Sequence, residues 1–314
     1  MRCGPVPLPR PDTQTWPAKG ALLRCNKWLG DRGFVRHVLR VGDPQSLFLT
    51  IAALLLAGAG AGFAGGLFGI GGGFVVVPAL VFLMPLFGTA PADVAHVAVG
   101  TSLATIIFTS IRSTMSHAAR EAVDFSVLKS WAPFVIGGTV LGSLIADRVT
   151  GSELAILFGI GVLIFAAYFL IPRRARLAEA QRIAMPTGLP RAGLAGGLGL
   201  ISALLGIGGG TVTTLVMTSC GNPIHRAIGT AAGMGAIIAI PGTIGFLIIG
   251  SGEASLPWGS VGYVYLPAAL VITFMSVLIA PLGVATAHYL PADVLRRVFG
   301  VYLLVVGVTM IAKN

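Results

Sequence analysis

Two glycine clusters are the residues of this chain whose type and spacing best suit the binding of a ligand. Gly-Ile-Gly-Gly-Gly begins at Gly69 and again at Gly206, and each copy interrupts an apolar segment. Each glycine disfavours a helix by about 1 kcal/mol relative to alanine, so we expect both helices to break there. A helix that restarts after such a break presents backbone N–H groups and the positive end of its dipole, which together bind anions. The predicted ligands are Gly69, Gly71, Gly72, Gly73, Gly206, Gly208, Gly209 and Gly210.

A second interpretation of the same glycines is close packing, because small residues let membrane helices approach each other. The duplication favours a binding site. Two broken helices in corresponding positions of two half-chains indicate the substrate site of a transporter.

Histidine and threonine also recur at equivalent positions. His96 stands four residues before Gly-Thr101, as His225 stands four residues before Gly-Thr230. The histidines suit donation to an anion or transfer of a proton, and equally suit a helix start at the headgroup level. The two threonine hydroxyls can donate to the same cavity or bond back to their own helix.

Carboxylates are scarce in the apolar segments, and this scarcity excludes several functions. Asp93, Asp147, Glu153 and Asp293 lie at segment ends, whereas cation carriers usually keep a carboxylate in mid-span. The chain also lacks the Gly-x-Ser-x-Gly and His-Glu-x-x-His patterns of hydrolases. Its three cysteines form no Cys-x-x-Cys pair. We therefore expect no enzymatic activity, no metal site and no cofactor.

Composition identifies the elements that must position these groups. The chain has 314 residues, of which 55% are hydrophobic and 10% charged, with a mean hydropathy of +0.90. A soluble protein carries about 25% charged residues, so we predict an all-α polytopic membrane protein. The net charge of +10 is concentrated in residues 1–46 and 172–191. Such basic loops indicate membrane orientation and not a nucleic-acid partner.

Three matches in the same order indicate an internal duplication. They are the glycine clusters, the His-x-x-x-Gly-Thr segments, and Leu154-x-x-x-Phe158-Gly159 with Leu295-x-x-x-Phe299-Gly300. We expect a basic cytoplasmic arm (1–46), which is interfacial or disordered, then a first repeat (47–171), an arginine-rich linker (172–191) and a second repeat (192–314). Each repeat should hold about four spans and one half-helix, roughly eight to ten apolar elements in all.

The predicted orientation satisfies the charges of the first repeat only. A cytoplasmic arm and a cytoplasmic linker require an even number of crossings between them. The same number in the second repeat places the acidic loop 250–260 inside and Arg296–Arg297 outside, against the positive-inside rule.

The paired glycine clusters, the Gly-Thr pair after each, and the duplicated layout resemble the TauE/SafE family of sulfite and organosulfonate exporters over residues 47–312. The resemblance implies a small sulfur oxyanion or sulfonate as substrate and a bacterial inner membrane as location. The expected function is export of a small anion by alternating access. The alternatives are a carrier of small carboxylates and a non-transporting membrane scaffold or assembly factor.

Overall fold

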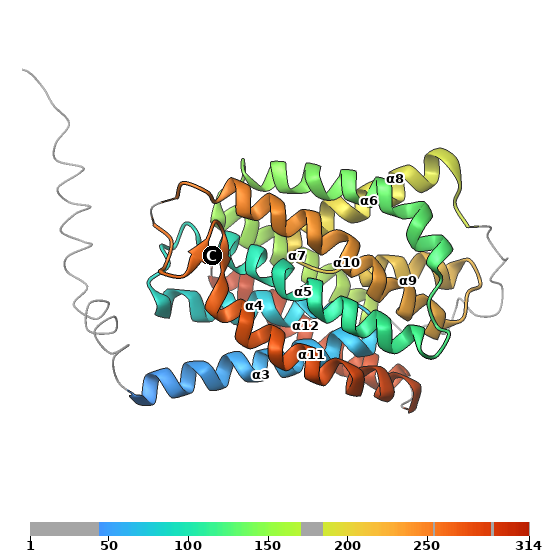
Figure 1. Cartoon of the computed structure of the whole chain (residues 1–314), viewed down its shortest axis with the longest axis horizontal. Coiled ribbons are helices and arrows are strands. Elements are labelled where there is room, and N and C mark those ends of the chain that lie inside the picture. The colour runs from blue at the N-terminus through green and yellow to red at the C-terminus, as the bar shows by residue number, and fades with distance from the viewer. Residues whose placement is uncertain (1–43, 171–184, 254, 290–291, 314) are drawn as a thin grey trace, which may run out of the picture.

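The described chain is almost entirely helical (Figure 1). A computed structural model describes residues 44–170, 185–253, 255–289 and 292–313, so most of the predicted arm and linker lies outside the described residues. The first half contains α3 (Pro44–Phe68), α4 (Gly73–Leu83), the 3-10 helix η2 (Met84–Phe87), α5 (Val94–Ala118), α6 (Phe125–Ala146) and α7 (Gly151–Leu170). The second half contains α8 (Gly188–Leu205), α9 (Gly210–Ser219), α10 (Ile224–Ile249), the strands β1 (Ser260–Val261) and β2 (Val264–Tyr265), α11 (Leu266–Tyr289) and α12 (Ala292–Lys313).

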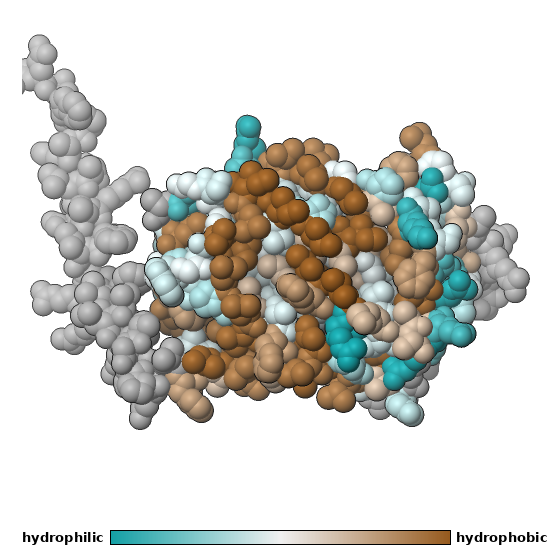
Figure 2. Space-filling model, in the orientation of Figure 1, coloured by the Kyte–Doolittle hydropathy of each residue, from teal (hydrophilic) through white to brown (hydrophobic). Residues whose placement is uncertain are grey.

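These helices confirm the predicted all-α polytopic membrane protein. Seven helices of the described residues are long and apolar enough to cross a membrane: α3, α5, α6, α7, α8, α10 and α11. Figure 2 shows a belt of hydrophobic side chains across the middle of the molecule, with the hydrophilic ones gathered mainly towards its two ends. The belt matches the hydrocarbon layer that these helices require.

The two halves have the same order of helices. Each half has a long helix, a glycine cluster, a short helix and three further helices. The largest helix contacts join the halves: α3 with α11, α8 with α6, α5 with α10, and α7 with α12. The first helix of each half thus pairs with the fourth helix of the other half.

Helix directions show that the second half is inverted relative to the first. Gly100 of α5 lies against Phe246 of α10 and Gly229 of α10 against His117 of α5, so these equivalent helices are antiparallel. By contrast, Gly58 faces Ile272 and Gly66 faces Ala280, so α3 and α11 run in parallel. The start of α3 and the end of α12 therefore share one end of the bundle, called here the terminal end. The end of α7 and the start of α8 share the opposite end, called the linker end (Figure 1).

The short helices turn back and do not complete a crossing. Gly65 of α3 contacts Gly71, and Gly60 contacts Val75, so α4 returns antiparallel along α3. In the second half, Asn222 after α9 lies beside Met185 before α8, so α9 likewise returns to the end where α8 begins. In the described part of the chain α5, α6 and α7 alternate in direction, so the start of α3 and the end of α7 lie at opposite ends of the bundle. These directions do not agree with the expected even number of crossings between arm and linker.

The duplicated Gly-Thr pairs join the two halves. Thr101 Oγ1 accepts a hydrogen bond of 2.9 Å from the N–H of Tyr265, directly before α11. Thr230 Oγ1 accepts one of 2.8 Å from the N–H of Asp124, directly before α6. Gly100 and Gly229 lie against the carbonyls of Tyr263 and Ala122, where a Cβ would overlap the backbone. Each pair thus fastens the other half's fourth helix.

We predict that Thr101→Val and Thr230→Val each lower the free energy of unfolding by about 1–3 kcal/mol, because each leaves a backbone N–H without its acceptor. Thr105→Val is the control, since the Thr105 hydroxyl donates only to Ser102 O of its own helix. The measurement is unfolding of the purified protein in mixed micelles. Equal effects of all three changes would contradict the fastening role.

Candidate functional site

The two glycine clusters meet in the interior of the bundle. The N–H of Gly208 donates to Ile70 O over 3.2 Å. Gly210 packs on the carbonyl of Gly69, and Gly73 packs on the carbonyl of Gly206, so closely that a Cβ at Gly73 or Gly210 would overlap the facing backbone. This contact between two backbones brings together the glycines that the sequence predicts as ligands.

Glycine is required where each short helix begins. Gly72 (φ 83°) and Gly209 (φ 63°) are the residues before α4 and α9, and both adopt the left-handed conformation. Side chains rarely tolerate this conformation. This conformation allows the backbone of each half to reverse direction within the bundle and to start a new helix there.

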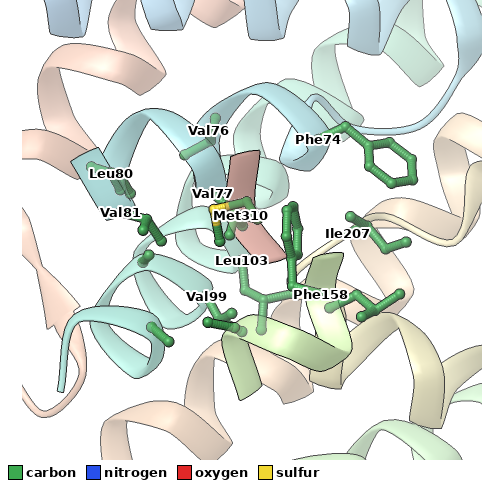
Figure 3. Packing of buried hydrophobic residues seen from close by; sticks show 14 of the residues in the cluster. Phe74, Val76, Val77, Leu80, Val81, Val99, Leu103, Phe158, Ile207 and Met310 are labelled. Atoms are coloured by element: carbon green, nitrogen blue, oxygen red, sulfur yellow. The ribbon is translucent and has the colours of Figure 1, made fainter. Parts of the chain in front are cut away.

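The positive ends of both short helices therefore point to the same place. The first N–H groups of a helix have no acceptor within that helix. At α4 and α9 these groups start from Gly73 and Gly210, which lie on either side of the crossing. Figure 3 shows Val77 and Leu80 of α4 among side chains of neighbouring helices, including Val99 and Phe158. The protein encloses the broken backbone, as a membrane interior requires.

Ser110 is a residue at the crossing that the sequence did not single out. It lies on α5, is fully buried, and its hydroxyl has no hydrogen-bond partner among the described residues. The Oγ atom lies between Gly71 and Gly235, where added Cβ atoms would meet it. Ser110 is one of several serines and threonines along α5, so its type and spacing give no signal in the sequence. Its role depends on which backbone lies opposite.

Buried negative charge is absent from the crossing. Among the described residues Asp93 is the one carboxylate that is buried, and it precedes α5 at the terminal end. There its Oδ2 accepts a hydrogen bond of 2.6 Å from Ser255. The positive helix ends thus face no carboxylate that would compete with an anionic ligand.

The two histidines lie at opposite ends of the bundle, because α5 and α10 are antiparallel. His96 is buried near the terminal end, where its Nε2–H donates to Ala146 O over 3.1 Å and its ring stacks on Tyr263. His225 is exposed at the start of α10, near the linker end. The structure brings neither histidine to the glycine crossing, and proton transfer by them stays a prediction. Thr101 and Thr230 likewise lie in the joints described above.

Residues 255–265, between α10 and α11, cover the terminal end beside His96. Tyr263 and Tyr265 insert into the bundle and are buried. Burial, with the negative charges of Asp93, Glu253 and Asp147 nearby, raises the pKa of Tyr263 to about 12, so it stays neutral at physiological pH. The corresponding connection in the first half, residues 119–124, is much shorter.

A cavity of about 190 Å³ adjoins the crossing on the side of α9. Its lining comes from α8, from Ile207 and the first residues of α9, from Phe165 of α7, from Ile70 of the first cluster, and from Phe74 of α4. Gly209 and Gly210 belong to this lining, so two of the predicted ligands face open space.

Comparison with known proteins gives one family. Residues 54–310 match the family described as sulfite exporter TauE/SafE. A probable membrane transporter protein of Haemophilus influenzae is 33% identical over 269 residues, which cover 85% of this chain and 100% of that protein. A probable membrane transporter protein of Methanocaldococcus jannaschii is 30% identical over 274 residues, covering 84% of this chain and 96% of that protein. No solved structure matches the chain.

We predict that Gly73→Ala and Gly210→Ala destabilise the fold by about 1–3 kcal/mol, because each added methyl group would overlap a carbonyl of the facing cluster. Gly197→Ala on α8 is the control: no atom lies near its added Cβ, and alanine favours the helix. The midpoint of unfolding in detergent measures all three. If the first two variants were as stable as the control, the tight crossing would be refuted.

Proposed function

Because the chain belongs to the sulfite exporter TauE/SafE family, whose relatives are named as membrane transporters, we propose that it exports sulfite or an organosulfonate by alternating access. The anion binds at the crossing of the two glycine clusters. The protein acts as a carrier and not as an enzyme.

The convergence of two helix N-termini on one buried point is the observation that carries this proposal. Each N-terminus offers backbone N–H donors and about half a positive charge, without the desolvation cost of a buried lysine or arginine. Ser110 adds a buried hydroxyl without a partner. Sulfite and sulfonate head groups each carry three oxygens that accept several hydrogen bonds at once, so such a site suits them.

The inverted halves support alternating access. In transporters built from inverted repeats the substrate site lies at the repeat interface, and exchange of the two repeats' conformations opens it to either side. Here each half contributes one returning short helix to the crossing. Because both halves have the same order of elements, a conformation that opens the site to one side of the membrane has an equivalent that opens it to the other side.

The linker end faces the cytoplasm of a bacterial inner membrane in this proposal. Arg120, Lys129 and Arg226 lie at or near that end. Asp93, Asp147 and Glu253 lie at the terminal end, where Arg148 pairs with Asp147. With this orientation, most of the basic residues in the short loops of both halves lie on the cytoplasmic side, as the positive-inside rule requires. In this orientation the chain enters α3 from the periplasmic side, so the proposal departs from the predicted cytoplasmic arm (1–46), most of which lies outside the described residues.

Flux into and out of proteoliposomes tests the function. Labelled sulfite, sulfoacetate and taurine are compared with acetate and succinate, with protein-free vesicles as control. Movement of the sulfur anions supports the proposal, and preferential movement of acetate or succinate supports the carboxylate carrier instead. No flux of any anion through folded protein would support a scaffold.

Ser110→Ala is expected to lower anion flux about tenfold, because a hydrogen bond from a neutral donor to a charged acceptor is worth about 1.5–3 kcal/mol. The protein should remain as stable as the wild type, since the change removes an unpaired buried hydroxyl. Ser116→Ala is the control, because the Ser116 hydroxyl is exposed and bonds to its own helix at Arg112 O. Unchanged flux in Ser110→Ala would remove this serine from the site.

Export should carry net negative charge outward and respond to voltage at constant pH. An inside-negative potential does about 2.3 kcal/mol of work per charge per 100 mV, hence about 4.6 kcal/mol for a dianion, or a concentration ratio above about a thousandfold. Current recorded on planar membranes measures the charge. Electroneutral flux driven by a pH gradient and lost in His96→Ala or His225→Ala would make the histidines the coupling site.

Alkaline phosphatase fused after Asn314 is expected to be active in the periplasm, because α12 ends at the terminal end. The same enzyme inserted after Ala180 in the linker should be inactive. The opposite pattern of activities would reverse the proposed orientation.

A further inference from the structure

We propose that the cavity beside the second glycine cluster binds the hydrocarbon group of an organic anion whose charged head lies at the start of α9. The transported class is then anions with an apolar substituent, in preference to inorganic oxyanions or doubly charged sulfonates. This inference rests on the proposed function, because it places the head group at the crossing of the two clusters.

The cavity has the size and the walls for a small apolar group. Its volume is about 190 Å³, and an engineered apolar cavity of about 150 Å³ binds benzene. Phe74 and Phe165 form one wall, with their rings edge to face and their centroids 5.3 Å apart. Leu198 and Ile201 of α8 form another wall, and Ile201 is half exposed, so the cavity opens to the surface of the bundle on this side. A ring or a chain of a few carbons fits this space.

The polar groups of the cavity gather at one end. Gly209, Gly210 and Thr211 lie there, at the positive end of α9. Thr211 is 7% exposed, and its hydroxyl has no hydrogen-bond partner among the described residues. An unpaired buried donor beside a helix N-terminus is an arrangement that an anionic head group would complete. The head group and its hydrocarbon then occupy opposite ends of one cavity.

The same walls discriminate against a second charge. No residue that lines the cavity carries an ionisable side chain. The ammonium of taurine or the carboxylate of sulfoacetate would lose its hydration there without gaining a partner. Conversely, each buried methylene is expected to tighten binding roughly fourfold.

Gly197→Leu tests the cavity directly. Gly197 lines the cavity, and an added Cβ meets no atom within 4 Å, so a leucine fills the space without a backbone clash. Gly137→Leu is the matched control, because Gly137 is exposed on α6 and its added Cβ also meets nothing. Both variants replace a helical glycine by the same residue. Only one of them changes the cavity.

Binding is measured on purified full-length protein by calorimetry with sulfite, benzenesulfonate and the neutral benzenesulfonamide. We expect wild type and Gly137→Leu to bind benzenesulfonate at least about tenfold more tightly than sulfite or benzenesulfonamide. Gly197→Leu should bind benzenesulfonate no more tightly than sulfite, and its affinity for sulfite should be unchanged. Thr211→Val should weaken both anions about tenfold, and Thr211→Ser should restore them.

The outcomes separate this inference from the proposed function. Equal affinities of Gly197→Leu and Gly137→Leu for benzenesulfonate would overturn the cavity even if the protein transports sulfite. Equal binding of benzenesulfonate and benzenesulfonamide would overturn the placement of the head group. If no anion crosses the membrane, but Gly197→Leu alone loses binding of benzenesulfonate, the binding cavity is supported and the proposed export function is refuted.

Discussion

The close contact between the two glycine clusters is the constraint on which the arrangement of the helices depends. Gly73 lies on the carbonyl of Gly206, Gly210 lies on the carbonyl of Gly69, and a hydrogen bond of 3.2 Å joins Gly208 to Ile70. A bilayer offers no water to free backbone groups, so two broken helices are stable there only if protein covers both breaks. Each cluster covers the other. The helix pairs α3 with α11 and α8 with α6 then place both breaks at one point.

This constraint also explains why close packing and ligand binding need not be alternatives for these glycines. Gly73 is required by the approach of a facing backbone, whereas Gly72 and Gly209 are required by a left-handed conformation that starts a helix. Both requirements place the first residues of α4 and α9 at the crossing. A site made from backbone donors can therefore hold an anion in an apolar interior without any buried cationic side chain.

Inversion of the halves accounts for the distribution of charge. In the proposed orientation the acidic loop 250–260 lies outside and the basic start of α12 lies inside, which is the reverse of what an even number of crossings gives. Both segments then agree with the positive-inside rule. The halves are still not identical. The second half inserts Tyr263 and Tyr265 over the terminal end. The cavity is lined mainly by α8 and the start of α9, with Phe74 contributed by α4.

The sequence by itself determined the membrane class, the order of the helices and the family, because apolar length, helix-breaking glycines and repeated motifs are local properties. It also located the starts of both short helices to within a few residues. Only the tertiary structure decided that α4 and α9 turn back, since their direction depends on the contacts of Gly60 with Val75 and of Asn222 with Met185. The tertiary structure likewise separated His96 from His225, gave Thr101 and Thr230 partners in the opposite half, and brought Ser110 to the crossing. The physical reason is that equivalent positions in a duplicated sequence lie at opposite ends of a bundle when the repeats are inverted. Residues meet at the centre only where helices of both halves cross.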